Sequence, residues 1–140
     1  MKRLKFLLVD DSPSTNFFNE IMIKKTAEYE EIQIAKNGED ALERLNSSFI
    51  PDVILLDINM PIMNGWEFLE EFQNLDARFD NTMIILMLGA KLSTDQKELI
   101  TTIPNVRGCI EKMLTKDMVI NIVTKFREKT LLNKCESILD

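Results

Sequence analysis

The sequence contains no histidine, and this absence excludes several kinds of chemistry. Without an imidazole the chain cannot carry a Ser-His or Cys-His nucleophile pair, most zinc sites or a phosphohistidine. Only two cysteines occur, Cys109 and Cys135, and neither belongs to a CxxC pair. Two cysteines are too few for a disulfide framework or a four-cysteine metal site. We therefore expect reduced thiols and a cytoplasmic location.

Long apolar runs and flexible linkers are also missing. No uncharged apolar stretch approaches the roughly 20 residues that cross a bilayer, so no membrane insertion is expected. The apolar run Leu4–Val9 stops at Asp10-Asp11, which is too early for a signal peptide. In 140 residues there is no Gly/Ser/Pro-rich linker, which favours one domain. We assign residues 1–130 to that domain and 131–140 to a short tail, with no output domain.

Acidic residues outnumber basic ones. The chain has 23 Asp and Glu against 17 Lys and Arg, which gives a net charge of −6. Because a nucleic-acid backbone needs a basic protein face, direct DNA binding is not expected as the main function. Metal cations and basic patches on other proteins are the partners that this charge favours.

Short apolar, β-branched runs alternate with longer amphipathic runs along the whole chain. The predicted strands are Leu4–Val9, Ile32–Ala35, Val53–Leu56, Met83–Leu88 and Val106–Ile110. The candidate N-caps of the helices that follow them are Ser12, Asn37, Asn64, Ser93 and Thr115. The last helix is predicted to run to about residue 130. This alternation predicts an α/β fold, a doubly wound parallel sheet in the order 2-1-3-4-5 with helices on both faces.

Three carboxylates follow two strands whose ends should meet. Asp10 and Asp11 follow the first strand, and Asp57 follows the third, on either side of the point where the strand order reverses. A single Asp after a strand is usually a solvated loop residue or a helix cap. Three together destabilise a fold unless a cation offsets their charge, and oxygen ligands suit Mg²⁺. The cluster therefore predicts a magnesium site.

Lys112 follows the fifth strand at the same edge of the sheet. A lysine at such an edge is most often simply solvated, but beside three acids it can pair with a carboxylate or hold a phosphoryl oxygen. A metal ion and an ammonium that face one Asp make a site for an aspartyl phosphate.

These residues resemble the motifs of response regulator receiver domains in two-component signalling. The Asp10-Asp11 pair, the run from Asp57-Ile58-Asn59-Met60-Pro61 to Gly65, and Lys112 match that family in order and spacing over roughly residues 4–127. The resemblance implies a flavodoxin-like (βα)₅ sandwich and a stand-alone, single-domain receiver.

The resemblance also implies roles for the site residues. Asp57 would be the phosphoacceptor for a histidine kinase or a histidine phosphotransfer protein, and Lys112 would contact the phosphoryl group. Mg²⁺ would be held by Asp11, Asp57 and the backbone carbonyl of Asn59. Asp10 would act on the metal mainly through water.

Three positions depart from the family pattern. Gly89 stands where a Thr or Ser hydroxyl is expected at the end of the fourth strand, and Cys109 stands in place of the aromatic residue usual in the fifth strand, two or three residues before the lysine. We expect Cys109 to be a small core residue rather than a redox sensor. Met113 replaces the proline that normally follows the lysine, so the Lys112-Met113 bond should be trans.

Two functions follow from this pattern. The leading hypothesis is a phosphoryl-accepting receiver, not an enzyme with an external substrate, that acts on an unidentified protein as a monomer or weak dimer. Its contact face would include the helix after Ser93, the fifth strand and the last helix. The alternative is a phosphorylation-independent docking module, which Gly89, Cys109 and Met113 favour and the acids and Lys112 oppose.

Three further expectations follow from the sequence. An aspartyl-nucleophile phosphatase is disfavoured because Asn59 stands where an acid/base group is needed. Trp66 should lie near the site. The apolar pairs Leu131-Leu132 and Ile138-Leu139 could mediate a dimer or cover the core.

Overall fold

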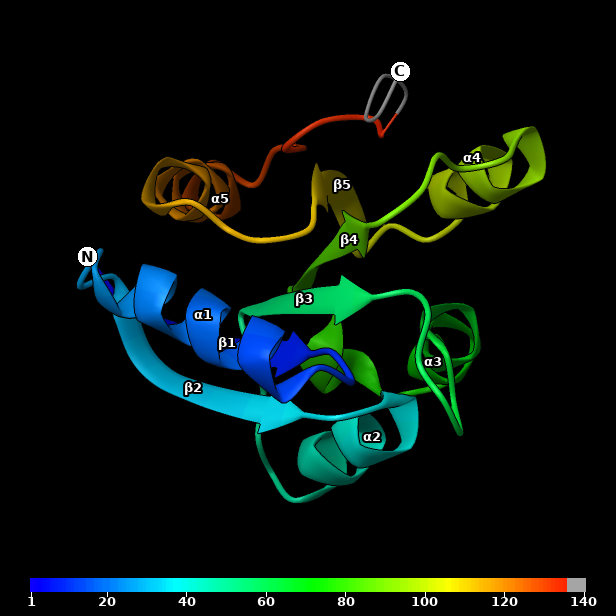
Figure 1. Cartoon of the computed structure of the whole chain (residues 1–140), viewed down its shortest axis with the longest axis horizontal. Helices are drawn as coiled ribbons and strands as arrows, with labels where there is room; N and C mark the ends of the chain where they lie inside the picture. The colour runs from blue at the N-terminus through cyan, green and yellow to red at the C-terminus, as the bar shows by residue number, and fades with distance from the viewer. Residues whose placement is uncertain (136–140) are drawn as a thin grey trace.

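Five parallel strands form one sheet between two layers of helices in the computed structural model, which describes residues 1–135 (Figure 1). The strands are β1 (Leu4–Val9), β2 (Tyr29–Ala35), β3 (Val53–Asp57), β4 (Met83–Leu88) and β5 (Val106–Glu111). Their order is β2-β1-β3-β4-β5, and every neighbouring pair is parallel. The predicted flavodoxin-like, doubly wound fold is confirmed, although β2 begins at Tyr29 rather than at Ile32.

Each strand is followed by a helix that starts at a predicted cap. The helices are α1 (Pro13–Lys24), α2 (Gly38–Asn46), α3 (Gly65–Phe72), α4 (Thr94–Thr101) and α5 (Lys116–Glu128). The capping side chains accept backbone N–H groups of the first turn, and they belong to Ser12, Asn37, Asn64, Ser93 and Thr115. A short 3₁₀ helix at Ala77–Phe79 was not predicted, and α5 ends at Glu128 where Lys129 adopts a left-handed conformation.

The core has two halves because alternate side chains of each strand point to opposite faces of the sheet. In β1, Leu7 and Val9 face the layer of α2, α3 and α4, whereas Phe6 and Leu8 face α1 and α5. Every residue of β3 and β4 is buried, as expected for central strands of a parallel sheet. Asp57 is therefore a carboxylate at the end of an otherwise apolar buried strand.

The chain after α5 turns back along the outer edge of β5 (Figure 1). Leu132 donates its N–H to the carbonyl of Arg107, and Cys135 is disulfide-bonded to Cys109. The expectation of two reduced thiols is wrong for this structure. The two cysteines are 26 residues apart in the sequence, and this spacing does not predict that the tail returns to β5 and brings them together.

The structure shows where one of the two apolar pairs of the tail, Leu131-Leu132, lies. Leu132 packs against the core, whereas Leu131 is exposed. Ile138 and Leu139 lie outside the described residues. Within residues 1–135, no helix has the length and apolar character needed to cross a bilayer.

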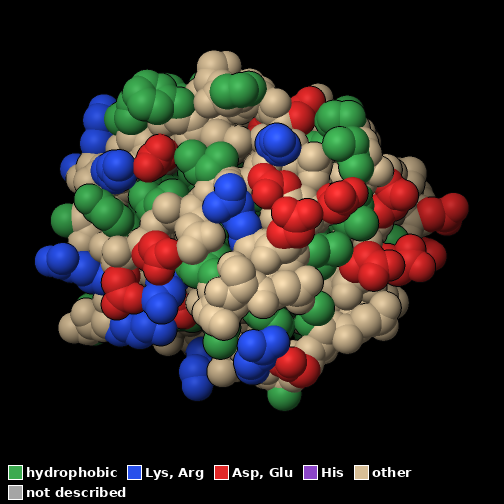
Figure 2. Space-filling model, turned by 90° about the horizontal axis from the view of Figure 1, so that it is seen from below, with side chains coloured by type: hydrophobic (Ala, Val, Ile, Leu, Met, Phe, Trp, Pro, Cys, Tyr) green, Lys and Arg blue, Asp and Glu red, His purple; other side chains and the backbone are tan. Residues whose placement is uncertain are grey.

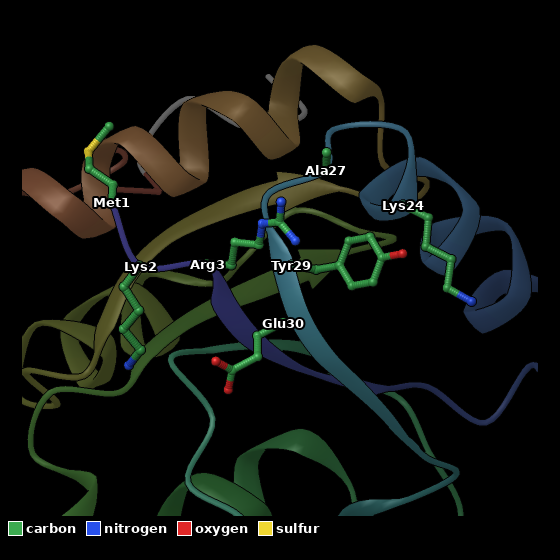
Figure 3. A pocket seen from close by; sticks show the side chains of 7 residues that line it. All are labelled: Met1, Lys2, Arg3, Lys24, Ala27, Tyr29 and Glu30. Carbon is green, nitrogen blue, oxygen red and sulfur yellow. The ribbon is translucent and has the colours of Figure 1, made fainter.

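A pocket of about 630 Å³ lies where the strands begin, at the opposite end of the sheet from the strand ends considered below (Figure 3). It is lined by Met1, Lys2, Arg3, Lys24, Ala27, Tyr29 and Glu30. Two of its cations are paired with acids outside the pocket, since Lys2 lies 3.1 Å from Asp52 and Lys24 lies 3.1 Å from Glu20. With its lysines neutralised in this way, the pocket offers no convergent set of reactive groups.

Candidate functional site

Asp10, Asp11 and Asp57 meet where β1 and β3 end. The two strands are in register with Val9 opposite Leu56, so the residues that follow are neighbours. One carboxylate oxygen from each of the three acids lies within 4.8 Å of the others. Asp10 and Asp57 are buried, whereas Asp11 is exposed. The predicted convergence of the three carboxylates is thus present in the structure.

Asp10 is fixed by hydrogen bonds on its backbone and its side chain. Its N–H donates to the carbonyl of Ala35 (3.1 Å), and its own carbonyl accepts the side-chain amide of Asn16 (2.8 Å). Its Oδ1 accepts the N–H of Ser12 (2.9 Å). Burial raises the pKa of Asp10, and the charges of Asp57 and Asp11 add to the rise, against the opposing effects of the Ser12 N–H and of Lys112.

Lys112 forms ion pairs with two of these acids. Its Nζ lies 2.9 Å from Asp57 Oδ1 and 3.5 Å from Asp10 Oδ2. Partial burial lowers the pKa of Lys112, but the two carboxylates outweigh this effect and the net pKa is raised. The ammonium therefore stays protonated and spans the two buried acids.

The charge of Lys112 leaves this acidic site incompletely compensated. Asp57 Oδ2 and Asp10 Oδ2 are buried without a hydrogen-bond partner, although such atoms are normally satisfied in folded proteins. One ammonium cannot neutralise three carboxylates, and the donors are all hard oxygens. This donor set fits Mg²⁺, which binds one or two carboxylates and fills its other positions with water and phosphate oxygens.

The loop after β3 is held close to the site by a glycine. Gly65 donates its N–H to the carbonyl of Ile58 (2.8 Å), and a Cβ added to Gly65 would lie 2.7 Å from the backbone oxygen of Asp57. Asn64 then starts α3 with a capping box that includes Glu67. The backbone approach that positions α3 beside Asp57 therefore requires glycine at position 65.

A pocket of about 290 Å³ opens beside Asp57 and Lys112. Asn59, Trp66 and Gly89 also line it, so Trp66 lies near the site as expected. A Cβ added to Gly89 would meet no atom within 4 Å. The position where the family carries a hydroxyl is thus open space at the wall of this pocket.

The loop that carries Lys112 is held without a cis peptide bond, since none occurs in the described part of the chain. Met113 instead adopts a left-handed conformation with φ of 76°. The next N–H, that of Leu114, donates to Oδ1 of the buried Asn19 (3.0 Å). Sequence reasoning missed Asn19, which is buried on the inner side of α1 together with Asn16 and Ile23.

Cys109 is buried on the α4 side of the sheet, as a small core residue should be. Its sulfur is not a thiol, because it is bonded to Cys135. The position that usually carries an aromatic residue therefore ties β5 to the tail in this chain.

The surface charge is uneven on the face drawn in Figure 2. On the face drawn in Figure 2, acidic side chains gather at the right-hand side, and most of the basic side chains lie to the left. Because this view keeps the horizontal axis of Figure 1, the acidic side is the side toward which β3 points. On this face, the end of the molecule toward which β3 points carries the charge that attracts cations.

Comparisons with known proteins agree with this geometry. The family model described as response regulator receiver domain matches residues 6–124. The structure is similar to that of a two component response regulator from Cytophaga hutchinsonii, with a TM-score of 0.80, 29% identity, and coverage of 90% of this chain and 98% of that one. It is also similar to the chemotaxis response regulator CheY4 of Vibrio cholerae, with a TM-score of 0.72, 25% identity, and coverage of 89% and 98%.

Curated relatives are longer proteins. A protein-glutamate methylesterase/protein-glutamine glutaminase 2 from Carboxydothermus hydrogenoformans is 27% identical over 139 residues, which are 99% of this chain and 37% of that protein. The chain spans between 18% and 37% of the length of the eight curated relatives first matched. The likeness is therefore to one part of each relative.

Proposed function

We propose that this chain, which belongs to the response regulator receiver domain family, accepts a phosphoryl group on Asp57 and signals through protein contact. The observation that carries the proposal is the state of the Asp57 carboxylate. One oxygen is paired with Lys112 at 2.9 Å, and the other is buried without a hydrogen-bond partner beside two more acids. A carboxylate so placed is held in position and left with a free oxygen.

The proposed reaction is a displacement at phosphorus. An oxygen of Asp57 forms a new O–P bond while the P–N bond to the donor imidazole breaks, and the departing imidazole nitrogen takes up a proton. Lys112 holds a phosphoryl oxygen during the transfer, because its ammonium already lies against the acceptor carboxylate. Since this chain has no histidine, the phosphohistidine belongs to a partner.

The residues that would hold Mg²⁺ are Asp11, Asp57 and the backbone carbonyl of Asn59, with Asp10 acting mainly through water. When bound, the ion neutralises negative charge on the phosphoryl oxygens and the carboxylates. Two buried oxygens without a hydrogen-bond partner support this assignment: Asp57 Oδ2, and Asp10 Oδ2, whose ion pair with Lys112 Nζ is 3.5 Å long.

We assign the partners by the same chemistry. The donor is a histidine kinase or histidine phosphotransfer protein in the cytoplasm, and the output is a contact with another protein by a monomer or weak dimer. Residues 1–130 are the receiver and 131–140 are its tail. We propose a signalling module without turnover of an external substrate; the methylesterase activity is named for longer relatives, which this chain matches only in part.

Intact mass tests the proposal. The chain is incubated with Mg²⁺ and acetyl phosphate, with and without EDTA, next to an Asp57→Asn variant that keeps the shape of the side chain. We expect a gain of one phosphoryl group in the wild type with Mg²⁺ only. A gain of the same size in Asp57→Asn would contradict the assignment of the acceptor.

A specific observation favours a second candidate, the phosphorylation-independent docking module. Gly89 leaves open space where a switching hydroxyl would stand, and Cys109 is locked to the tail. If wild type gains phosphate but hydrogen exchange in α4 and β5 stays the same, the docking module is the better description. A change in exchange on phosphorylation supports the receiver.

A further inference from the structure

The outer edge of β5 is covered by the chain's own tail. β5 is the last strand in the sheet order, so one side of its backbone has no neighbouring strand. An uncovered strand edge is a template for pairing with another chain, and native proteins often shield it. Residues 131–135, which we call the strap, lie along this edge.

The strap is held by backbone and side-chain hydrogen bonds. Leu132 donates its N–H to the carbonyl of Arg107 (2.7 Å). The side chain of Asn133 makes a pair of bonds with Cys109, accepting its N–H (3.0 Å) and donating to its carbonyl (2.9 Å). Asn133 therefore takes the place that the backbone of a sixth strand would occupy at that residue.

Gly108 is shaped to receive the strap. A Cβ at position 108 would lie 2.7 Å from the Cβ of Leu132, so any larger residue would push the strap away. The φ of Gly108 is not in the left-handed region, and its glycine therefore serves this close approach rather than a special backbone conformation.

The strap is one wall of a groove. A pocket of about 540 Å³ lies between α4 and the strap, over the first residues of β5. Leu131, Asn133 and Cys135 line it on the strap side, and Ile100 and Ile103 line it on the α4 side. The groove in this form exists only while the strap is in place.

We infer that the Cys109–Cys135 disulfide is a redox-controlled latch that holds the strap over the edge of β5. The disulfide joins Cys135, the last residue of the strap, to Cys109 in the strand that the strap covers. The two cysteines have a sequence separation of 26. Leu131 and Lys134 are exposed, whereas Cys135 is buried. Among the described residues, the noncovalent contacts that hold the strap are its hydrogen bonds to Arg107 and Cys109 and the packing of Leu132 and Cys135 against the core. Breaking the disulfide removes the one covalent constraint on this segment.

The opening reaction is thiol–disulfide exchange with a dithiol reductant. A thiolate of the dithiol attacks the sulfur of Cys135, the S–S bond breaks, and Cys109 leaves as a thiolate that takes up a proton. The second thiol of the reductant then displaces Cys135 and closes the reductant's own disulfide. Two electrons and two protons pass from the dithiol to the protein, and an oxidised dithiol is released.

Hydrogen exchange on the full chain tests the latch. The comparison covers three samples: oxidised wild type, wild type reduced with dithiothreitol, and Cys135→Ser. Exchange is measured at two amides that join the strap to β5, that of Cys109, which donates to Asn133, and that of Leu132, which donates to Arg107. We expect exchange at both amides to rise about tenfold or more on reduction. Cys135→Ser should match reduced wild type, and dithiothreitol should not change it further. The amide of Leu8 in the sheet centre should exchange equally slowly in all three.

Proteolysis and mass provide independent readouts. Trypsin should cut after the exposed Lys134 faster in the reduced chain, and Thr130→Ser, which keeps both cysteines, should behave as wild type in either state. Alkylation of both thiols in a chain that has first been treated with an oxidant would overturn the proposal, because the Cys109–Cys135 disulfide would then not form in the folded protein. Equal exchange and equal cleavage before and after reduction would also overturn it.

Discussion

Lys112 Nζ lies 2.9 Å from Asp57 Oδ1, while the other oxygen of the same carboxylate is buried without a hydrogen-bond partner. The ammonium thus compensates one side of a cluster that contains three acids. This arrangement makes Lys112 a stabilising residue, and the proposed function gives it a second role as the group that contacts the phosphoryl oxygen.

Lys112→Met should separate these two roles. Removal of the cation leaves Asp57 and Asp10 buried without a counter-charge, so the free energy of unfolding without metal should fall by about 1–3 kcal/mol. Mg²⁺ should restore part of this loss, because it supplies positive charge to the same carboxylates. Urea denaturation with and without Mg²⁺ measures both effects, and Lys116→Met on the exposed start of α5 is the control.

Asp10→Asn should stabilise the metal-free protein. Burial and the neighbouring acids raise the pKa of Asp10 in the fold, so the ionised form opposes folding. Asparagine keeps an Oδ1 that accepts the Ser12 N–H but removes the charge. We expect the free energy of unfolding at pH 7 to be higher for Asp10→Asn than for wild type, measured by urea denaturation in EDTA.

The pH dependence of that gain identifies its cause. The folded state holds the Asp10 proton more tightly than the unfolded state does, so wild type loses stability as pH rises from the unfolded pKa through the raised folded pKa. The advantage of Asp10→Asn should therefore vanish below about pH 4, where the acid is protonated in both states. An equal gain at pH 3 and pH 7, measured in EDTA, would point to packing rather than charge.

Much of this architecture could be predicted because local signals and topology agreed. The caps at Ser12 and Asn64 fixed where helices begin, and apolar runs fixed the strands that bring Asp10 and Asp57 together. Lys112 followed from the same rule about strand ends.

Contacts between segments distant in sequence could not be predicted in this way. The bond from Leu114 to Asn19 spans 95 residues, and nothing near either residue indicates it. Cys109 and Cys135 carry no spacing motif, and their pairing depends on the path of the tail after Lys129 turns left-handed. Such features arise from tertiary packing and not from local propensity.

Gly89→Thr should be accepted without loss of stability. A Cβ at this position meets no atom within 4 Å, and Gly89 does not have a positive φ, so the change in unfolding free energy should stay within about 0.5 kcal/mol. The new hydroxyl would stand at the wall of the pocket that Asp57 and Lys112 line.

The same substitution tests how the site communicates. If the missing hydroxyl limits the response, phosphorylated Gly89→Thr should show larger changes in hydrogen exchange in α4 and β5 than phosphorylated wild type. Gly89→Ala is the matched control, because it adds the Cβ without the hydroxyl. Identical exchange changes in the three proteins would show that the hydroxyl does not limit the response.

Ile62→Gly should raise stability even though it removes an apolar side chain. Ile62 has a φ of 69°, a left-handed conformation that a β-branched residue adopts at a cost of roughly 1–2 kcal/mol, and its side chain is 74% exposed. Glycine adopts this conformation freely, although its larger unfolded-state entropy offsets part of the gain, so we expect a net increase of about 0.5–1 kcal/mol. Ile62→Val keeps the β-branch and should leave the free energy of unfolding near that of wild type.

A loss of stability in Ile62→Gly, measured by urea denaturation, would mean that Ile62 makes a contact in solution that outweighs its backbone strain. In that case the side chain of Ile62 would help to hold the loop between β3 and α3, beside the backbone hydrogen bonds that Met63 and Gly65 make.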